Sequence, residues 1–587
     1  FFSSLMGFLE ACLLLAGCFP LRAIHASLQT ELLTEPKTGQ KPHIVMILLD
    51  DFGWNDIGYH RKNRPQPEQD EIKTPYMDSL VAEGIELDRH YVYKFCSPSR
   101  SALQSGRNPY HVNPLNLAPT NHNPADPVSG FSAIPRNMTG IATKLSAAGY
   151  KTAFFGKWDA GMATLDHTPK GRGYQQSMLY FHHTNDYWTF YAGNKCKKGS
   201  EEVPVVDIWK ADAEGEGPAF NYNGTCSKVD VTGDQCRHGP HFGTQNGYED
   251  ALFAHQVMES VRAHNPADPM FLCWTPHIVH TPLEVPRKFL ERFDFIAKKT
   301  GPDADKPNHE RQIYHAMVNF ADEAIGNLTS LLKAKGMWDN TLLVFSTDNG
   351  GPVYQNGLAG ANNFPLKGGK MSNWEGGVRG NAFVSGGFLP EAVRGTVSEQ
   401  YITLWDWYST FSSLAGVDAT DHRAAAAGLP PIDSLDMSDL VLGRNLTSPR
   451  SEVALGTANI AQTGGLLEGL IQGAWKLLWT PDAPFQAMGQ SGWQGPFYPN
   501  ASNTNCFAFA GGPCLQNCAD GCLYNIVSDP GEHNNVAKEN PQLLQALKDR
   551  LKELNKTAFN PDRGPEDPKS CQAALDKYGG YWGPFAD

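Results

Sequence analysis

The sequence predicts an α/β domain with a mostly parallel central sheet flanked by helices, followed by a smaller α+β domain. Three observations lead to this fold class. Short apolar segments alternate with helical patterns from about residue 42, polar residues directly follow several of these segments, and closely spaced short strands replace the alternation after about residue 450. A chain of 587 residues with 30 Phe, 20 Tyr and 13 Trp can bury a large core, which excludes a disordered protein.

The larger domain is expected to cover residues 42–445. Apolar runs at residues 43–49, 151–155, 270–274 and 341–346 are short and continuous, which is typical of strands buried on both faces. Residues 141–148 form a helical pattern that Gly149 stops. A longer pattern at residues 310–335 is closed by Gly336, with apolar side chains at helical spacing: Ile313, Met317, Phe320, Ala324, Leu328 and Leu331. We expect residues 185–250, which are polar and rich in glycine, to form a long surface insertion.

Residues 446–587 form the predicted smaller domain. Short strands are expected at residues 467–472, 475–479 and 522–526, and a helix rich in Leu and Lys at residues 541–554. A meander of short strands followed by a helix is typical of a small α+β domain that packs beside a larger one.

Residues 1–26 are expected to form a signal peptide. The apolar stretch at residues 13–17 is too short to span a bilayer and precedes small residues near Ala26; a buried N-terminal helix is the alternative. The sequence starts at Phe1 without a charged segment, so we expect a truncated N-terminus. Residues 27–41 are expected to form a polar tail. No second apolar stretch reaches 18 residues, and no integral membrane segment is therefore expected.

Sequons and clustered cysteines indicate the secretory pathway, with an extracellular or lysosome-like location. Six Asn-x-Ser/Thr sequons occur, at Asn137, Asn223, Asn327, Asn445, Asn500 and Asn555. We expect disulfides within two groups of cysteines: Cys196, Cys226 and Cys236, and then Cys506, Cys514, Cys518 and Cys522. A zinc site is the alternative for the second group, although its spacing matches no zinc ribbon and no histidine is interleaved.

The net charge of −13, from 49 basic and 62 acidic residues, argues against a nucleic-acid partner. A protein that binds a phosphate backbone needs an excess of basic residues to displace counterions. An anionic small-molecule substrate remains possible if basic residues gather locally and reverse the overall field.

Polar residues follow four of the predicted strands at the point where each strand ends: Asp50-Asp51, Lys157 with Asp159, His277 with His280, and Asp348-Asn349. Because the carboxyl ends of parallel strands meet at one edge of a sheet, we expect these side chains to converge. Adjacent carboxylates repel each other unless a cation lies between them. An all-oxygen ligand set favours Ca²⁺ or Mg²⁺ over zinc. Asx turns or helix caps at the strand ends are the alternative for either pair.

The segment Cys96-Ser97-Pro98-Ser99-Arg100 precedes a predicted helix at residues 101–104. A nucleophile at a helix N-terminus beside an arginine suits an anionic substrate. On these residues alone, Cys96 is either a thiolate nucleophile or a disulfide cysteine.

Several motifs together resemble the type I, formylglycine-dependent, sulfatases. Cys96-x-Pro98-x-Arg100 with Ser105-Gly106-Arg107 resembles the first signature of that family, and residues 149–158 (Gly-Tyr-x-Thr-x-x-x-Gly-Lys-Trp) match the second. Further similar strings follow in the family's order, at residues 49–56, 346–351, 365–370, 374–380 and 523–534. Residues 53–58 and 280–286 most resemble the arylsulfatase B (N-acetylgalactosamine-4-sulfatase) branch.

The resemblance implies an alkaline-phosphatase-like core and a sulfuric ester hydrolase that acts on a sulfated carbohydrate. It implies that a formylglycine-generating enzyme oxidises Cys96 to formylglycine, whose hydrate is the nucleophile. It assigns Asp50, Asp51, Asp348 and Asn349, with modified Cys96 nearby, to a cation that is Ca²⁺ or else Mg²⁺. It also assigns Arg100 to the nucleophile, and Lys157, His280 and Lys370 to the sulfate and leaving group, where positive charge is needed.

This sequence departs from the family pattern at three positions. Gln104 and Ser105 replace an apolar residue and a threonine of the first signature, while the Cys-x-Pro-x-Arg core is intact. Asp159 replaces the histidine that accepts a proton from the formylglycine hydroxyl, and we expect Asp159 to act as the base, with His183 as the next candidate. Two alternative functions remain: a phosphate or phosphonate ester hydrolase, and a catalytically weak pseudoenzyme that binds sulfated glycans.

Overall fold

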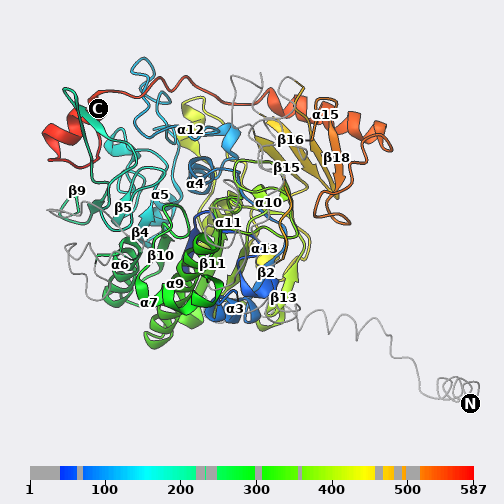
Figure 1. Ribbon diagram of the computed structural model, residues 1–587, viewed down its shortest axis with the longest axis horizontal. Helices are drawn as coiled ribbons and strands as arrows, with labels where there is room; N and C mark the ends of the chain where they lie inside the picture. The colour runs from blue at the N-terminus through cyan, green and yellow to red at the C-terminus, as the bar shows by residue number, and fades with distance from the viewer. Residues whose placement is uncertain are drawn as a thin grey trace, which may run out of the picture.

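The computed structural model describes residues 40–61, 71–219, 232, 247–297, 307–353, 360–456, 467–481, 492–496 and 516–587. A large sheet with helices on both faces makes up most of the molecule, and a smaller sheet with its own helix lies at one end (Figure 1). The predicted signal peptide, most of the predicted tail, and several sequons and cysteines lie outside the described residues: Asn223, Asn500, Cys226, Cys236, Cys506 and Cys514.

The large sheet has ten strands in the order β13-β2-β12-β11-β1-β10-β4-β5-β8-β9. Its centre is a run of five parallel strands: β11 (Thr341–Thr347), β1 (His43–Leu49), β10 (Met270–Thr275), β4 (Lys151–Lys157) and β5 (Gln176–Tyr180). Antiparallel pairing appears only toward the edges, through β12 (Ala382–Ser385) with β2 (Ile85–Leu87) and through β8 (Trp209–Ala211) with β9 (Glu216–Pro218). The predicted fold class is therefore confirmed.

Alternation along β1 explains why both faces of the sheet need helices. Val45, Ile47 and Leu49 pack into one hydrophobic cluster, whereas the intervening Ile44, Met46 and Leu48 pack into another. Successive side chains of a strand point to opposite faces, so a continuous apolar run is stable only when both faces are covered. One face is covered by α3 (Pro75–Ala82), α6 (Glu249–Ala263) and α9 (Pro307–Ala334), and the other by α4 (Cys96–Ser105), α5 (Ile141–Ala147) and α11 (Asp406–Leu414).

Two local expectations were wrong. The helix after the Cys-x-Pro-x-Arg segment begins at Cys96 and not at residue 101, because Pro98 occupies the first turn, where the missing N–H costs nothing. Residues 185–250 are only partly a surface insertion. Tyr187, Trp188 and Phe190 are buried in the core, and β8 and β9 from this stretch extend the large sheet. The apolar residues of this stretch are scattered among polar residues and glycines, so the sequence showed no clear strand pattern there.

The smaller sheet is antiparallel, in the order β15 (Glu452–Gly456), β16 (Leu467–Gln472), β17 (Trp475–Leu478) and β18 (Cys522–Asn525). Helix α15 (Pro541–Asn555) packs on it through Leu547 and Leu551. A disulfide joins Cys518 to Cys522, which excludes these two cysteines as zinc ligands. The predicted meander and helix are present at the expected positions.

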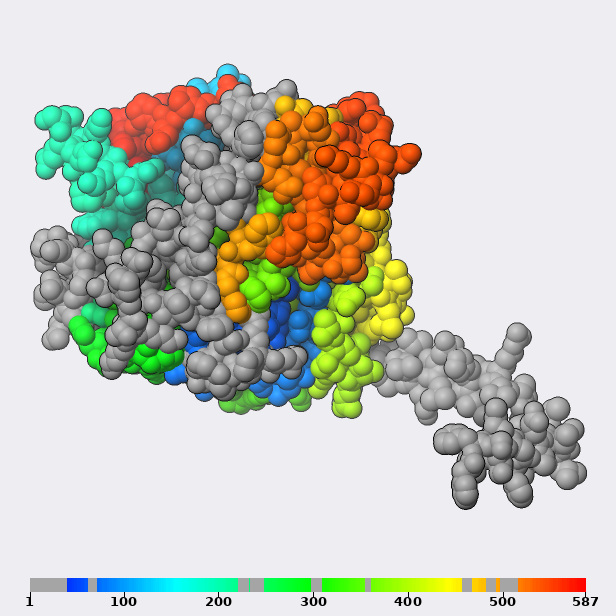
Figure 2. Space-filling model, turned by 45° about the vertical axis from the view of Figure 1, so that its right-hand side comes forward, coloured from blue at the N-terminus to red at the C-terminus, as the bar shows by residue number. Residues whose placement is uncertain are grey.

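The chain after α15 leaves the small sheet and returns to the opposite end of the molecule, beside β8 and β9 (Figures 1 and 2). Cys571 forms a disulfide with Cys196, 375 residues away, and Trp582 N–H donates to Val206 O. Cys196 was expected to pair within its own cluster. Its disulfide with Cys571 instead anchors the last residues of the predicted smaller domain on the large domain.

A buried ion cluster joins the smaller sheet to the large domain. The Lys476 ammonium on β17 lies 3.0 Å from Glu375 Oε1 and 2.9 Å from Glu532 Oε1, and all three side chains are fully buried. Removing the cation would take the nearest positive charge from two buried carboxylates, although Arg379 NH1 would stay 3.8 Å from Glu375 Oε2. Breaking a buried pair in this way costs about 3–5 kcal/mol.

We therefore expect Lys476→Met to lower the free energy of unfolding by about 3–5 kcal/mol, as measured by denaturant titration. Arg550→Met is the matched control, because Arg550 pairs with Glu452 at the surface and is 46% exposed. Solvent screening limits that pair to about 1 kcal/mol or less. Equal losses in the two variants would contradict this role for Lys476.

Within the described residues, no helix combines the length and the apolar character that a membrane span requires.

Candidate active site

The carboxyl ends of four of the five central parallel strands bring the predicted polar residues to one edge of the sheet. Asp50 and Asp51 follow β1, and Asp348 and Asn349 follow β11. Lys157 ends β4, and His280 lies in the loop after β10. Each of these side chains is buried or nearly so. The sheet order explains the convergence, since these strands are neighbours and run in the same direction.

Three carboxylates in this cluster are paired with three side-chain cations. Lys157 Nζ lies 2.6 Å from Asp50 Oδ2, and Lys370 Nζ lies 2.7 Å from Asp51 Oδ1. Arg100 NH2 lies 2.8 Å from Asp348 Oδ2. Burial alone would raise the pKa of Asp50, but the positive charges of Lys157 and Arg100 hold it well below its usual range. The carboxylate of Asp50 is therefore ionised at neutral pH.

Cys96 lies in the middle of this cluster as the first residue of α4. Its Sγ is 3.5 Å from Asp50 Oδ1 and 3.5 Å from Asn349 Oδ1, and it forms no disulfide. Burial and the negative charge of Asp50 raise the pKa of the Cys96 thiol well above its usual value. A neutral thiol is a poor nucleophile. Both simple readings of Cys96, a thiolate nucleophile and a disulfide cysteine, are therefore disfavoured.

The environment of Asp51 suits a hard cation. Its Oδ2 is buried without a hydrogen-bond partner among the described residues, and His280 Nε2 lies 3.5 Å away. Burial, followed by the charge of Lys370, lowers the pKa of His280 to about 4, so the ring is neutral. His280 Nδ1 lies 2.6 Å from Thr281 O and donates to it, which leaves a lone pair on Nε2 facing the carboxylate. Ligand atoms of Asp50, Asp51, Cys96 and His280 all lie within 4.8 Å of one another.

Two of the expected cation ligands are held by neighbours within the cluster. Asn349 Nδ2 donates to Asp51 Oδ1 at 2.7 Å, and its Oδ1 faces Cys96. Asp348 Oδ1 accepts from Asp51 N–H at 3.3 Å, while its Oδ2 accepts from Arg100. The donor set of carboxylates and one amide fits Ca²⁺ or Mg²⁺ better than zinc.

Asp159 lies at the edge of the same cluster and is paired with a histidine. Lys157 Nζ lies 3.8 Å from Asp159 Oδ2. His183 Nδ1 lies 2.9 Å from Asp159 Oδ1 and 3.0 Å from Oδ2. The sequence singled out Asp159 but not this pairing, since the two residues are 24 positions apart. The available signal was the His182-His183 doublet just after β5.

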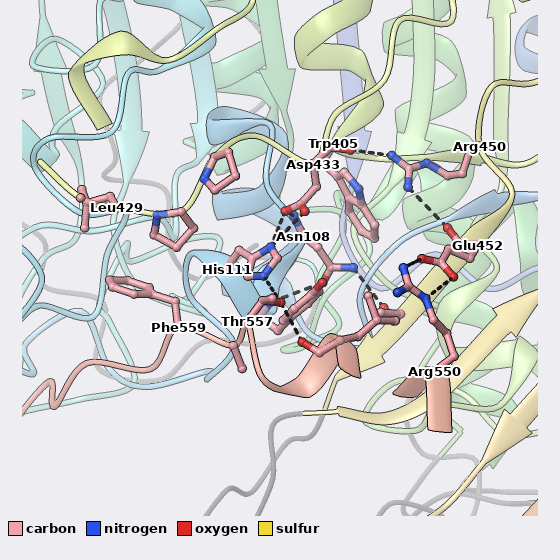
Figure 3. A pocket seen from close by; sticks show the side chains of 17 residues that line it. Asn108, His111, Trp405, Leu429, Asp433, Arg450, Glu452, Arg550, Thr557 and Phe559 are labelled. Carbon is pink, nitrogen blue, oxygen red and sulfur yellow. Dashed lines mark hydrogen bonds and ion pairs between the residues drawn. The ribbon is translucent and has the colours of Figure 1, made fainter. Parts of the chain in front are cut away.

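A cavity of about 630 Å³ lies elsewhere, between the two domains (Figure 3). His111 on its wall pairs with Asp433 at 2.9 Å and with Thr557 Oγ1 at 2.9 Å. Arg550 and Glu452 form an ion pair on another wall. None of the residues in the cluster around Cys96 lines this cavity, and its polar side chains connect the large domain to α15 and the segment that follows it.

The departures at Gln104 and Ser105 are accommodated inside α4. Tyr174 OH donates to Gln104 Oε1 at 3.0 Å, and Ser105 Oγ donates to Ser101 O at 2.7 Å. Both side chains satisfy their polar groups away from Cys96, so neither alters the groups that surround it.

Comparison with known proteins agrees with this architecture. Arylsulfatase J of Mus musculus is 29% identical over 95% of this chain and 83% of its own length. Arylsulfatase A of Homo sapiens is 26% identical over 86% of each chain. The crystal structure of the PsFucS1 sulfatase from Pseudoalteromonas sp. superposes with a TM-score of 0.63 at 21% identity, covering 92% of this chain and 95% of that one, and so shares the fold.

The similarity to the arylsulfatase B branch and the roles of single site residues stay predictions. The family itself is shown by a match over most of the large domain. The family model for sulfatases matches residues 42–417, and this chain therefore belongs to the sulfatase family, whose members are hydrolases of sulfate esters.

Proposed function

We propose that this enzyme hydrolyses sulfate monoesters of a carbohydrate, with residue 96 as the nucleophile. The observation that carries the proposal is the position of Cys96, buried at a helix N-terminus among Asp50, Asn349 and three side-chain cations. Because a neutral thiol is a poor nucleophile, Cys96 can act as a nucleophile in this position only after chemical modification. Relatives named N-acetylgalactosamine-6-sulfatase, 26–27% identical over about 70% of this chain, support a sugar as substrate.

The charge of the cluster supports a divalent cation, and Ca²⁺ is our proposal. Asp50, Asp51 and Asp348 are each balanced by one basic side chain, so a bound divalent cation would make the cluster electropositive. Asp51 Oδ2, which has no hydrogen-bond partner among the described residues, together with Asp50, Asp348 and Asn349, would hold it. When bound, such a cation offsets negative charge on the ester and the nucleophile.

Formylglycine derived from Cys96 supplies two hydroxyls on one carbon. One hydroxyl bonds to sulfur as the S–O bond of the ester breaks, and its proton leaves with the departing alcohol. Loss of a proton from the other hydroxyl then lets its O–H electrons form a carbonyl while the C–O bond to sulfate breaks. This chemistry requires a maturation enzyme in the secretory pathway, which we propose as the route of this chain to an extracellular or lysosome-like compartment.

The basic side chains of this chain bind and orient the ester. Lys157 pairs with Asp50 and Lys370 pairs with Asp51, within the cluster around Cys96. Ammonium groups make strong charge-assisted hydrogen bonds to sulfate oxygens. Arg100 donates to Asp348 and to Lys157 O at 2.8 Å, which fixes it beside α4. Neutral His280 has a free lone pair at Nε2 or can carry a proton there, which suits contact with the leaving-group oxygen.

Sulfate release measured by ion chromatography tests this proposal. Protein from a host that makes formylglycine should release sulfate from an aryl sulfate and from a panel of sulfated sugars, and should act far more weakly on the matching aryl phosphate and phosphonate esters. Faster hydrolysis of the phosphorus esters would favour the alternative hydrolase. Binding of sulfated sugars without any sulfate release would favour a pseudoenzyme.

A further inference from the structure

Asp159 and His183 form a pair that the family motifs do not contain. Asp159 is 2% exposed, and both of its carboxylate oxygens face one ring nitrogen, Nδ1 of His183, at 2.9 and 3.0 Å. The side chain of His183 is 27% exposed. Its other ring nitrogen, Nε2, is nevertheless buried and has no hydrogen-bond partner among the described residues. One nitrogen is thus held by a carboxylate while the other is open for a proton.

The charges around Asp159 keep it ionised. Burial opposes ionisation, but His183, Lys157 and Arg100 together lower the pKa of Asp159 below its usual value. An ionised carboxylate accepts a hydrogen bond from Nδ1–H and so fixes the tautomer whose lone pair is at Nε2. A carboxylate that already accepts this hydrogen bond and is stabilised by two cations is a weak base. Asp159 is therefore poorly suited to the role that the sequence suggested for it.

A continuous series of contacts links the pair to residue 96. Lys157 Nζ lies 3.8 Å from Asp159 and 2.6 Å from Asp50, whose Oδ1 is 3.5 Å from Cys96 Sγ. The neighbour of His183 along the chain, Thr184, contacts His277 Nε2 at 3.4 Å. His182 points elsewhere, since its Nδ1 pairs with Asp207 at 2.8 Å. The charged groups that act on the pair are Lys157 and Arg100.

We propose that His183 is the group that accepts the proton released from residue 96, and that Asp159 is its positioning residue. The inference rests on the proposed function. The lone pair of Nε2 takes the proton that leaves the residue 96 hydroxyl, and the O–H electrons remain on residue 96 as sulfate departs. The ring becomes an imidazolium, and its new positive charge lies against ionised Asp159 at 2.9 Å. A histidine from the segment after β5 thereby replaces the one that the motif lacks.

Steady-state and single-turnover kinetics on an aryl sulfate test the pair. We expect His183→Gln to lower kcat by about 10²–10⁴-fold, the usual contribution of a general base, with little change in KM. A burst of one equivalent of phenol without matching sulfate should appear, because the first half of the reaction is spared. Exogenous imidazole should restore turnover in His183→Ala. Asp159→Asn should lower kcat less, and the double variant should be no slower than His183→Gln.

His422→Gln is the matched control. His422 also pairs with an aspartate, Asp418, at 3.1 Å, but it is 79% exposed and lies outside the cluster around Cys96. Its kcat should equal that of the native enzyme. Normal turnover in His183→Gln combined with an inactive Asp159→Asn would overturn the proposal and make Asp159 itself the base.

A spectroscopic measurement separates this inference from the proposed function. In protein that retains Cys96, ¹⁵N NMR of labelled histidine should find His183 protonated at Nδ1 near neutral pH, and Asp159→Asn should abolish that preference. This measurement needs no turnover. A native enzyme that releases no sulfate would refute the proposed function, whereas His183 protonated at Nε2 would refute the pair.

Discussion

Replacing Cys96 with alanine is expected to lower kcat for sulfate release by about 10⁴-fold or more, the order found when the nucleophile of a covalent mechanism is removed. Alanine keeps α4 intact, because it is a good helix residue and Cys96 makes no disulfide. The basic side chains and the cation site stay in place, so substrate should still bind. Ion chromatography of released sulfate and a binding measurement with a sulfated sugar would separate the two effects.

Cys273→Ala is the control for this experiment. Cys273 is the other free buried cysteine among the described residues, and it lies on β10, where its Sγ is 4.0 Å from Gln104 Nε2. Its removal should leave kcat close to native and lower stability slightly. Sulfate release by Cys96→Ala at the native rate would contradict the assignment of the nucleophile.

Replacing Asp51 with asparagine is expected to remove the bound cation and to lower activity by at least about 100-fold, since even outer-shell changes at metal sites cost 10–100-fold. Asp51 has φ of 57°, in the left-handed region, where asparagine is tolerated far better than alanine. The variant should therefore fold. Elemental analysis should find about one divalent cation per native chain, with calcium expected, and much less in Asp51→Asn.

Asp322→Asn provides a comparison at another buried aspartate. Burial raises the pKa of Asp322 to about 7, and its carboxylate accepts from Met77 N–H at 2.8 Å, on α3 and away from the cluster. This variant should keep both cation and activity. Stoichiometric zinc in the native protein, or full activity after thorough chelation, would refute the proposed cation site.

Most of the fold could be predicted because the core strands carry a strong local signal. The apolar runs of β1 and β11 can be stable only between two layers of helices, and strand ends in a parallel sheet must meet. That topological rule also predicted which polar residues converge, including Asp50 and Asp348, which are almost 300 positions apart. The family motifs then named Cys96 within that group.

Features that depend on particular long-range contacts were not predictable in the same way. The Cys196–Cys571 disulfide joins segments with no shared pattern, and β8 and β9 are only three residues long. The pairing of Asp159 with His183 arises because β4 and β5 are neighbours in the sheet, which a list of motifs does not reveal. For the same reason, the proposal that His183 and not Asp159 is the base depends on the structure, which locates the partner of Asp159.

We propose that residue 96, once modified, becomes the nucleophile of this sulfatase. Mass spectrometry of the peptide that contains residue 96, from protein made in a host that forms formylglycine, tests it most directly. We expect a peptide about 18 Da lighter than the cysteine form, the change from thiol to aldehyde, in proportion to the sulfate-releasing activity of each preparation. Fully active protein in which residue 96 is entirely unmodified cysteine would contradict it.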